Sequence, residues 1–254
     1  MPDPIFADPR LAAIYDPLDP GRGDLDAYAA LVDEFGARQV LDVGCGTGSF
    51  ACLLARRGVE VVGVDPAGAS LDVARGKPGA DRVRWILGDA TTLPPLKADL
   101  AVMTGNVAQV FLTDEEWAAT LAGIRDALRP AGVLVFETRD PARRAWEEWD
   151  RARTYAVTDV RGVGVVESWC DVLKVSGPLV TFRQTYVFAS DGAVLTSDST
   201  LRFRSPEEVE GALRRAGFGC REVRDAPDRP GRELVFVADK LDQSGIARLD
   251  HRSL

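Results

Sequence analysis

The sequence predicts a doubly wound α/β sheet into which an antiparallel β meander is inserted. Through about the first half of the 254 residues, short apolar runs alternate with amphipathic helical segments, as in parallel strands joined by crossover helices. A glycine-rich turn follows the first of these runs, where α/β sheets bind their ligands. From 155 to 204 the alternation gives way to longer runs rich in Val, Thr, Phe and Tyr, and it resumes afterwards.

The elements of the α/β part follow from apolar periodicity and from turn residues. Parallel strands are expected at 40–43, 60–65, 83–87, 98–103 and 133–137. Helices are expected at 24–35, 50–57, 67–75, 114–128, 141–151 and 206–216. Two further strands are expected at 218–223 and 233–238. The first twenty residues hold four Asp-Pro pairs, which disfavour helix and leave room only for a short helical turn at 10–15.

The inserted region reads as four antiparallel strands. Alternating runs occupy 155–160, 163–175, 179–189 and 193–204, and each boundary carries a glycine. The pair Asp191-Gly192 between two such runs is a strong hairpin signal. The sequence therefore predicts a meander that follows the fifth strand of the α/β sheet.

Gly44, Gly46 and Gly48 stand at alternate positions between the first strand and the next helix. Such a turn lets a ligand approach the backbone because no Cβ intervenes, and the helix start offers free N–H groups. A dinucleotide fold would have its third glycine where this chain has Ser49. Asp65 ends the second strand, where a carboxylate can accept hydrogen bonds from both ribose hydroxyls, although it can also cap the following helix.

These residues resemble the first motif of the class I S-adenosylmethionine-dependent methyltransferases, D-x-G-x-G-x-G, which the chain matches at Asp42, Gly44, Gly46 and Gly48. The resemblance implies a Rossmann-like sheet of seven mostly parallel strands, with 218–223 and 233–238 as its last two. It also implies S-adenosyl-L-methionine as the cofactor. The residues that the resemblance places at the cofactor are Tyr15, Asp42, Gly44, Cys45, Gly46, Thr47, Gly48, Asp65, Pro66, Asp89, Ala90, Met103 and Thr104.

The resemblance also gives several of these residues a role. Asp89 and Ala90 would meet the adenine amino group and ring edge, and Tyr15 would lie near the methionine end. Met103 and Thr104, where the fourth strand ends, would form the floor between cofactor and acceptor. Ordinary structural roles stand beside these, because Gly-Asp is common in turns and a tyrosine often packs under a loop.

The candidates for the acceptor side follow the fourth and fifth strands. Asn106 offers a polar amide, Arg139 can pair with a carboxylate, and Glu137 can bind or deprotonate an amine. We expect these three as the catalytic residues, although each could instead be a satisfied polar group at a strand end. The meander, the segment 141–151 and the loop 105–111 are expected to wall the acceptor pocket.

Composition narrows the function classes. A net charge of −8 and an isoelectric point of about 4.9 disfavour nucleic acid and anionic membranes as partners. The four cysteines form no C-x-x-C pair, and the single histidine, His251, lies in a polar C-terminal segment, so we predict neither a metal site nor a histidine-dependent triad. The chain lacks a signal-peptide pattern and any long apolar run, so we expect a cytoplasmic protein.

The sequence thus predicts methylation of a nitrogen or oxygen of a small molecule by in-line transfer. The alternatives are a nicotinamide-dependent oxidoreductase and a protein that binds the cofactor without turnover. The expected partner is the small-molecule acceptor. The exposed face of the meander could also pair with a second copy of the chain in a homodimer. The expected domains are a methyltransferase domain of 1–153 and 205–240, the insertion 154–204 as acceptor-site wall, lid or dimer contact, and a polar tail of 241–254.

Overall fold

The computed structural model describes residues 1–19, 21 and 23–242, and its centre is a seven-stranded sheet. The strand order is β10-β11-β5-β4-β1-β2-β3, and all strands are parallel except β11, which runs antiparallel to both of its neighbours. The strands are β1 (Gln39–Val43), β2 (Glu60–Asp65), β3 (Val83–Leu87), β4 (Ala98–Met103), β5 (Leu128–Arg139), β10 (Phe218–Asp225) and β11 (Glu233–Lys240). The predicted fold class is confirmed.

The parallel strands β2, β3 and β4 have the predicted bounds, because each is a short apolar run closed by a polar residue or glycine. β5 begins at Leu128, earlier than the predicted start at 133, and so includes the residues between the expected helix and the expected strand. In the structure these residues form an irregularity within the strand pairing: Ala98 pairs with Leu128, whereas Leu100 pairs with Val133. Ala131 accommodates it with a φ of 59°.

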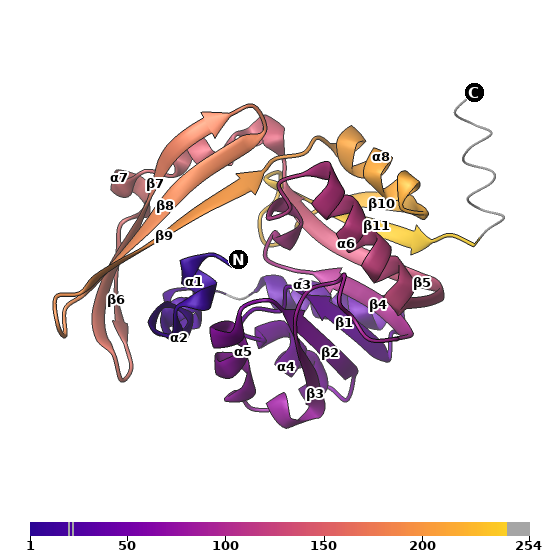
Figure 1. Cartoon of the computed structure of the whole chain (residues 1–254), viewed down its shortest axis with the longest axis horizontal. Helices are drawn as coiled ribbons and strands as arrows, with labels where there is room; N and C mark the ends of the chain where they lie inside the picture. The colour runs from indigo at the N-terminus through magenta and orange to yellow at the C-terminus, as the bar shows by residue number, and fades with distance from the viewer. Residues whose placement is uncertain (20, 22, 243–254) are drawn as a thin grey trace.

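Helices cover both faces of the sheet (Figure 1). One face packs on α6 and α8 through a core that includes Trp117, Leu213 and Phe136, and the other packs on α3 and α4 through a core that includes Tyr28 and Phe50. The helices of this part are α3 (Asp24–Glu34), α4 (Ser49–Arg56), α5 (Gly68–Arg75), η1 (Ala80–Arg82), η2 (Val107–Gln109), α6 (Asp114–Ala127) and α8 (Pro206–Arg215). Helices α6 and α8 both begin with complete capping boxes, as their sequences favour.

The inserted region forms a separate four-stranded antiparallel sheet of order β6-β7-β8-β9, which rises beside the main sheet in Figure 1. Its strands are β6 (Ala156–Val160), β7 (Gly164–Ser176), β8 (Leu179–Phe188) and β9 (Val194–Arg202). The predicted meander is therefore confirmed, with each strand within a few residues of its expected bounds.

The expectation of an irregular N-terminal segment was wrong. Residues 4–18 form two helices, α1 (Pro4–Ala7) and α2 (Pro9–Leu18). Pro4 and Pro9 occupy first helical positions, where the missing N–H costs nothing, and Asp8 caps α2 by accepting from the N–H groups of Arg10 and Leu11. An Asp-Pro pair thus starts a helix here, because the aspartate is the cap and the proline is the first residue.

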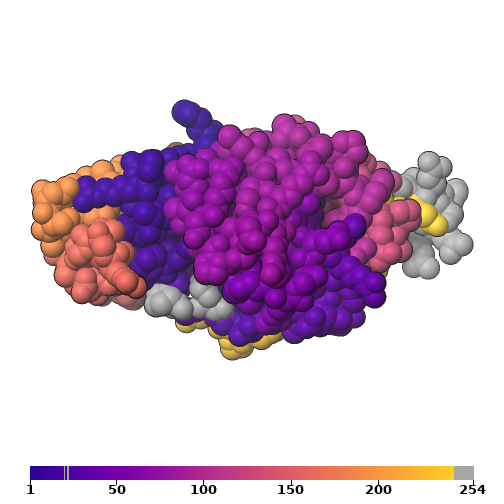
Figure 2. All heavy atoms as spheres, turned by 90° about the horizontal axis from the view of Figure 1, so that it is seen from below, coloured from indigo at the N-terminus to yellow at the C-terminus, as the bar shows by residue number. Residues whose placement is uncertain are grey.

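These two helices lie between the inserted sheet and α5 (Figures 1 and 2). Ile5, Leu11 and Ile14 are buried in one core with Val166 and Phe188 of the inserted sheet. Residues 4–18 therefore connect the insertion to helix α5 of the main domain.

The expected helix at 141–151 was also wrong. The segment instead contains three short pieces, η3 (Pro141–Arg143), η4 (Ala145–Glu148) and α7 (Arg151–Thr154). Arg144 has a φ of 46°, which interrupts any helix, and Asp140 and Asp150 cap new starts. Within the described part of the chain, no helix is both long and apolar enough to cross a membrane. The expected tail, apart from 241–242, and His251 lie outside the described residues.

Candidate active site

The glycine turn after β1 has left-handed φ angles at Gly44, Gly46 and Gly48 (70°, 52° and 74°). A Cβ at Gly44 would lie 2.7 Å from the side chain of Val107, and one at Gly48 would lie 2.5 Å from that of Trp85. At Gly46 the same position has no heavy atom of the described residues within 4 Å. Packing therefore requires the outer two glycines, whereas Gly46 offers the bare, open backbone that the sequence suggested for all three.

Asp65 at the end of β2 holds this turn in place. Its Oδ2 accepts a hydrogen bond from the N–H of Gly46 and its Oδ1 accepts one from the N–H of Ala67, each at 2.8 Å. Burial raises the pKa of Asp65, while the two backbone bonds act in the opposite direction. Because each carboxylate oxygen has two lone pairs, the side chain can still accept from two hydroxyls. Ala67 precedes α5, so Asp65 also orders the start of that helix.

The other predicted cofactor residues in or beside the turn differ in solvent exposure. Asp42 in β1 is 1% exposed, whereas Pro66 is exposed directly after Asp65. The Sγ atom of Cys45 lies toward Gly63 in β2, and burial raises the pKa of this thiol well above its usual range. The turn would therefore present Cys45 to a ligand through its backbone.

The ends of β3 and β4 flank the turn. Asp89 is exposed, and its Oδ1 accepts from the N–H (2.8 Å) and Oγ1 (2.6 Å) of Thr91, while Ala90 is buried. Met103 at the end of β4 is fully buried in the core on the α6 face, and Thr104 after it is half-buried. A ligand at this edge would meet Met103 through its backbone rather than its side chain.

Helix α2 is tied to the glycine turn through Asp16. Its Oδ1 accepts from the hydroxyls of Thr47 (2.8 Å) and Ser49 (3.1 Å), and its Oδ2 lies 2.5 Å from Nζ of Lys77. The same Nζ donates to Oγ of Ser49 at 2.8 Å. Tyr15, the residue before Asp16, packs on Phe6 with ring centroids 5.6 Å apart.

Tyr15 also packs against the inserted sheet. It lies on the core that α1 and α2 share with that sheet, which includes Tyr186. The structure therefore brings Tyr15 and the insertion together, beside the turn that carries Gly46 and Asp65.

Glu137 shapes the loop that follows β4. Its side chain is 5% exposed, and its Oε1 accepts from the N–H groups of Gly105 (2.5 Å) and Asn106 (2.9 Å). Both residues are left-handed, with φ of 75° and 62°, a conformation that glycine and asparagine adopt more readily than other residues. Burial, together with the neighbouring Glu233, raises the pKa of Glu137 to about 7, although the two backbone hydrogen bonds act in the opposite direction. Glu137 thus holds the loop, and a catalytic role for it stays a prediction.

Arg139 lies directly opposite Glu233 in the pairing of β5 and β11. Its Nη1 donates to Oε1 of Gln109 at 2.9 Å, and its Nε is 3.7 Å from Oε1 of Glu233. The guanidinium carbon is 5.5 Å from the ring centre of Trp149. Burial lowers the pKa of Arg139, although Glu233 opposes the shift. Asn106 donates from Nδ2 to the same Glu233 oxygen at 3.0 Å, so the three predicted acceptor-side residues share one network.

Comparisons with known proteins identify the family of this chain. Residues 40–132 match the family model described as a methyltransferase domain. The cypemycin N-terminal methyltransferase of Streptomyces sp. is 33% identical over 174 residues, which span 66% of this chain and 71% of that protein. The chain belongs to the S-adenosylmethionine-dependent methyltransferase family. The family assignment favours a methyltransferase over the nicotinamide-dependent alternative.

Two further matches show the range of this family. The malonyl-[acyl-carrier protein] O-methyltransferase of Serratia marcescens is 34% identical over 127 residues, which span 46% of this chain and about half (48%) of that relative. The solved structure of S-adenosylmethionine-bound CalS10, an amino pentose methyltransferase from Micromonospora echinaspora, has a TM-score of 0.69 and 23% identity, and covers 89% of this chain and 96% of its own. At that identity the likeness shows the fold.

Sequence reasoning missed Glu233, which joins the predicted acceptor-side residues of this methyltransferase. Glu233 is 4% exposed and accepts from Arg229 (Nη1, 2.8 Å) as well as from Asn106, so it is the hub of the network. A glutamate that opens an otherwise apolar strand was the available signal. Its partners were hidden, because they depend on the register of β11 against β5.

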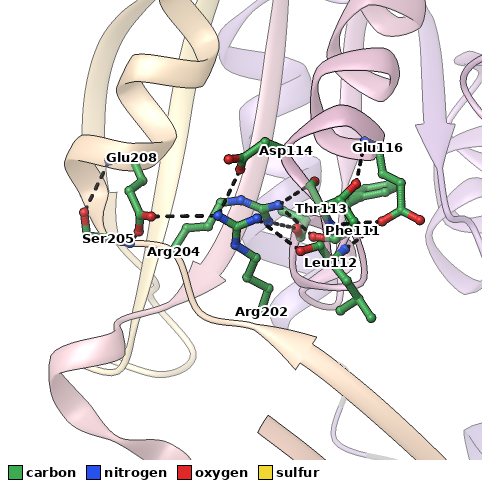
Figure 3. A network of polar contacts seen from close by, with 10 residues as sticks. Phe111, Leu112, Thr113, Asp114, Glu116, Arg202, Arg204, Ser205 and Glu208 are labelled. Atoms are coloured by element: carbon green, nitrogen blue, oxygen red, sulfur yellow. Dashed lines mark hydrogen bonds and ion pairs between the residues drawn. The ribbon is translucent and has the colours of Figure 1, made fainter. Parts of the chain in front are cut away.

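Two arginines at the exit of the insertion hold the loop on the acceptor side (Figure 3). Arg204 is 4% exposed and donates through Nη2 to the carbonyls of Phe111 (2.7 Å) and Thr113 (3.2 Å). Arg202 donates to the carbonyl of Leu112 at 3.1 Å and pairs with Asp114 at 2.9 Å. Burial lowers the pKa of Arg204 to about 10. The methyltransferase therefore couples its insertion to the loop expected to wall the acceptor pocket.

Proposed function

We propose that this methyltransferase methylates a nitrogen or oxygen of a small molecule held between the ends of β4 and β5, helix α2 and the inserted sheet. The observation that carries the proposal is the joint placement of the two halves of the site. Gly46 and Asp65 lie at the carboxyl ends of β1 and β2. The network of Asn106, Glu137 and Arg139 lies at the carboxyl ends of β4 and β5. The names of the relatives support it, since they act on an N-terminus, a malonyl group and an amino pentose.

The strand ends fit the cofactor. The open space at Gly46 accommodates a ligand against bare backbone, and the Asp65 carboxylate supplies acceptors for ribose hydroxyls. Bound S-adenosyl-L-methionine supplies a methyl group already activated on a sulfonium. Asp89, Ala90, Thr104 and Tyr15 would complete its site, together with the backbone of the turn residues and of Met103.

The chain's own contribution is alignment and exclusion of water. Glu137 fixes the loop of Gly105 and Asn106, and Asp16 fixes α2 over the turn. The inserted sheet and α2 share one core, so they close the site from the same side. No strong base is needed for a neutral amine acceptor, whose proton can leave to solvent after transfer.

The location, partners and domain division are part of the proposal. We place the enzyme in the cytoplasm without a nucleic-acid partner, in line with its net charge of −8. The insertion 154–204 would be the acceptor-site wall and the contact in a homodimer, because it exposes the apolar side chains of Val157, Leu173, Val175 and Val194. The remainder, 1–153 and 205–240, would be the methyltransferase domain.

The test is methyl transfer from labelled S-adenosyl-L-methionine to a panel of amines, amino sugars and hydroxy compounds. Transfer to at least one small molecule, with S-adenosylhomocysteine bound and NADH not bound, is the expected result. Cofactor binding without transfer across a broad panel would favour a protein that binds without turnover.

A further inference from the structure

We propose that the acceptor carries a carboxylate away from the methylated atom, and that Arg139 recognises it. This inference rests on the proposed function and names a feature of its substrate. Arg139 stands at the carboxyl end of β5, and its guanidinium lies over the ring of Trp149, which packs on Phe182 of the inserted sheet.

The hydrogen bonds of Arg139 leave much of its guanidinium free. A guanidinium has five N–H donors, and among the described residues Arg139 makes one hydrogen bond, from Nη1 to Gln109. The 3.7 Å between Nε and Glu233 is an ion-pair distance, too long for a hydrogen bond. The Arg139 side chain is 21% exposed, so part of it is open to a ligand.

Glu233 does not neutralise Arg139 in the manner of a dedicated partner. The same Oε1 atom is closer to Arg229 (2.8 Å) and to Nδ2 of Asn106 (3.0 Å). The protein therefore provides Arg139 with a distant, shared carboxylate, and a substrate carboxylate can supply the close bidentate pair that a guanidinium prefers.

The surroundings fix the direction of the free donors. Gln109 is 1% exposed and belongs to η2, whose following loop is clamped by Arg204. The guanidinium carbon lies over the ring of Trp149, 5.5 Å from the ring centre. A guanidinium held at one nitrogen and packed beside an aromatic ring has little freedom left, so it is preorganised for an oxyanion in its own plane, and a carboxylate matches that plane.

The experiment compares matched ligands on the full chain saturated with S-adenosylhomocysteine. The probes are 4-aminobenzoate and β-alanine, their primary carboxamides and their phosphonate counterparts, with affinities measured by calorimetry or ligand-observed NMR. We expect at least one carboxylate to bind about tenfold more tightly than its carboxamide. Arg139→Gln should abolish this ratio and Arg139→Lys should reduce it, while Arg143→Gln, an exposed arginine nearby, should leave it unchanged.

Each outcome decides the proposal. Equal affinity of acid and amide, an intact ratio in Arg139→Gln, tighter binding of the phosphonate, or no binding of any carboxylate would overturn it. Thermal unfolding and S-adenosylhomocysteine affinity within about twofold of wild type show that Arg139→Gln is folded, and Arg139→Lys gives the answer if it is not. Failure of S-adenosylhomocysteine to bind the wild type would instead contradict the proposed function.

Discussion

Burial makes Glu137 a weaker acid than an exposed glutamate, because its charge is desolvated and lies near Glu233. Its pKa rises from 4.5 to about 7, so between these values the unfolded chain loses the proton while the folded chain keeps it. The free energy of unfolding should therefore fall as pH rises from 4.5 to 7, by up to about 3 kcal/mol from this group.

Glu137→Gln removes this titration. Urea unfolding at pH 5, 6 and 7 should show a shallower loss of stability in the variant than in the wild type. Asp65 also has a raised pKa and is present in both proteins, so the difference between the two curves isolates Glu137. Identical pH dependence in the two proteins would mean that Glu137 is not protonated in the folded state at acid pH.

Gly46 allows the open backbone of the turn to be tested separately from its strain. Gly46→Val should abolish binding of S-adenosylhomocysteine, because the side chain would enter the space at which no atom of the described residues comes within 4 Å. Gly36→Val is the matched control, since Gly36 has a φ of 58° and equally open surroundings but lies between α3 and β1.

Both valine variants should lose about 1–2 kcal/mol of stability from the left-handed backbone. Calorimetric titration should then separate them, with normal affinity in Gly36→Val and none in Gly46→Val. Normal affinity in both would place the cofactor elsewhere.

At the scale of elements, α2 joins the glycine turn to the inserted sheet. Asp16 bonds to Thr47, Ser49 and Lys77 on one side, while Arg10 forms a two-bond ion pair with Asp191 on the other. Asp16→Asn removes the charge that Lys77 pairs with, so α2 should open more readily over the turn.

We expect S-adenosylhomocysteine to dissociate about three- to tenfold faster from Asp16→Asn, and the effect should shrink at high salt because screening weakens the pair in the wild type. Stopped-flow displacement measures the rate. Asp26→Asn, which removes a 3.4 Å exposed pair with Arg57, is the control and should match the wild type. Unchanged dissociation from Asp16→Asn would show that α2 does not gate the cofactor.

Elements that local signals define were predicted well. β2, β3 and β4 are apolar runs with polar ends, and Asp191-Gly192 marked the turn between β8 and β9. The errors concern segments 4–18 and 141–151, where the residues that begin or interrupt a helix are ambiguous or give no signal in the sequence. Asp8-Pro9 was interpreted as a helix breaker although it is a cap and a first turn, and Arg144, with a positive φ, carries no sequence signal for the break in 141–151.

At the scale of the whole molecule, the predicted cofactor edge was more accessible to sequence reasoning than the predicted acceptor side. Gly46 lies in the turn after β1 and Asp65 ends β2, so each is recognised from its position after or at the end of a predicted strand. The acceptor network instead joins Asn106, Arg139 and Glu233 from three separate segments, and it exists only because β11 lies antiparallel to β5 in one register. Register is a tertiary property that a single sequence does not reveal.

The whole account depends on a nucleoside sugar held by Asp65 beside Gly46, and calorimetric titration of S-adenosylhomocysteine into wild type, Asp65→Ala and Asp72→Ala tests it most directly. Asp72 is an exposed acid in α5 that pairs with Arg75, so it controls for loss of charge. We predict one site per chain, an affinity about ten- to a hundredfold weaker in Asp65→Ala, and no change in Asp72→Ala. Equal affinity in all three proteins, or no binding to the wild type, would contradict the account.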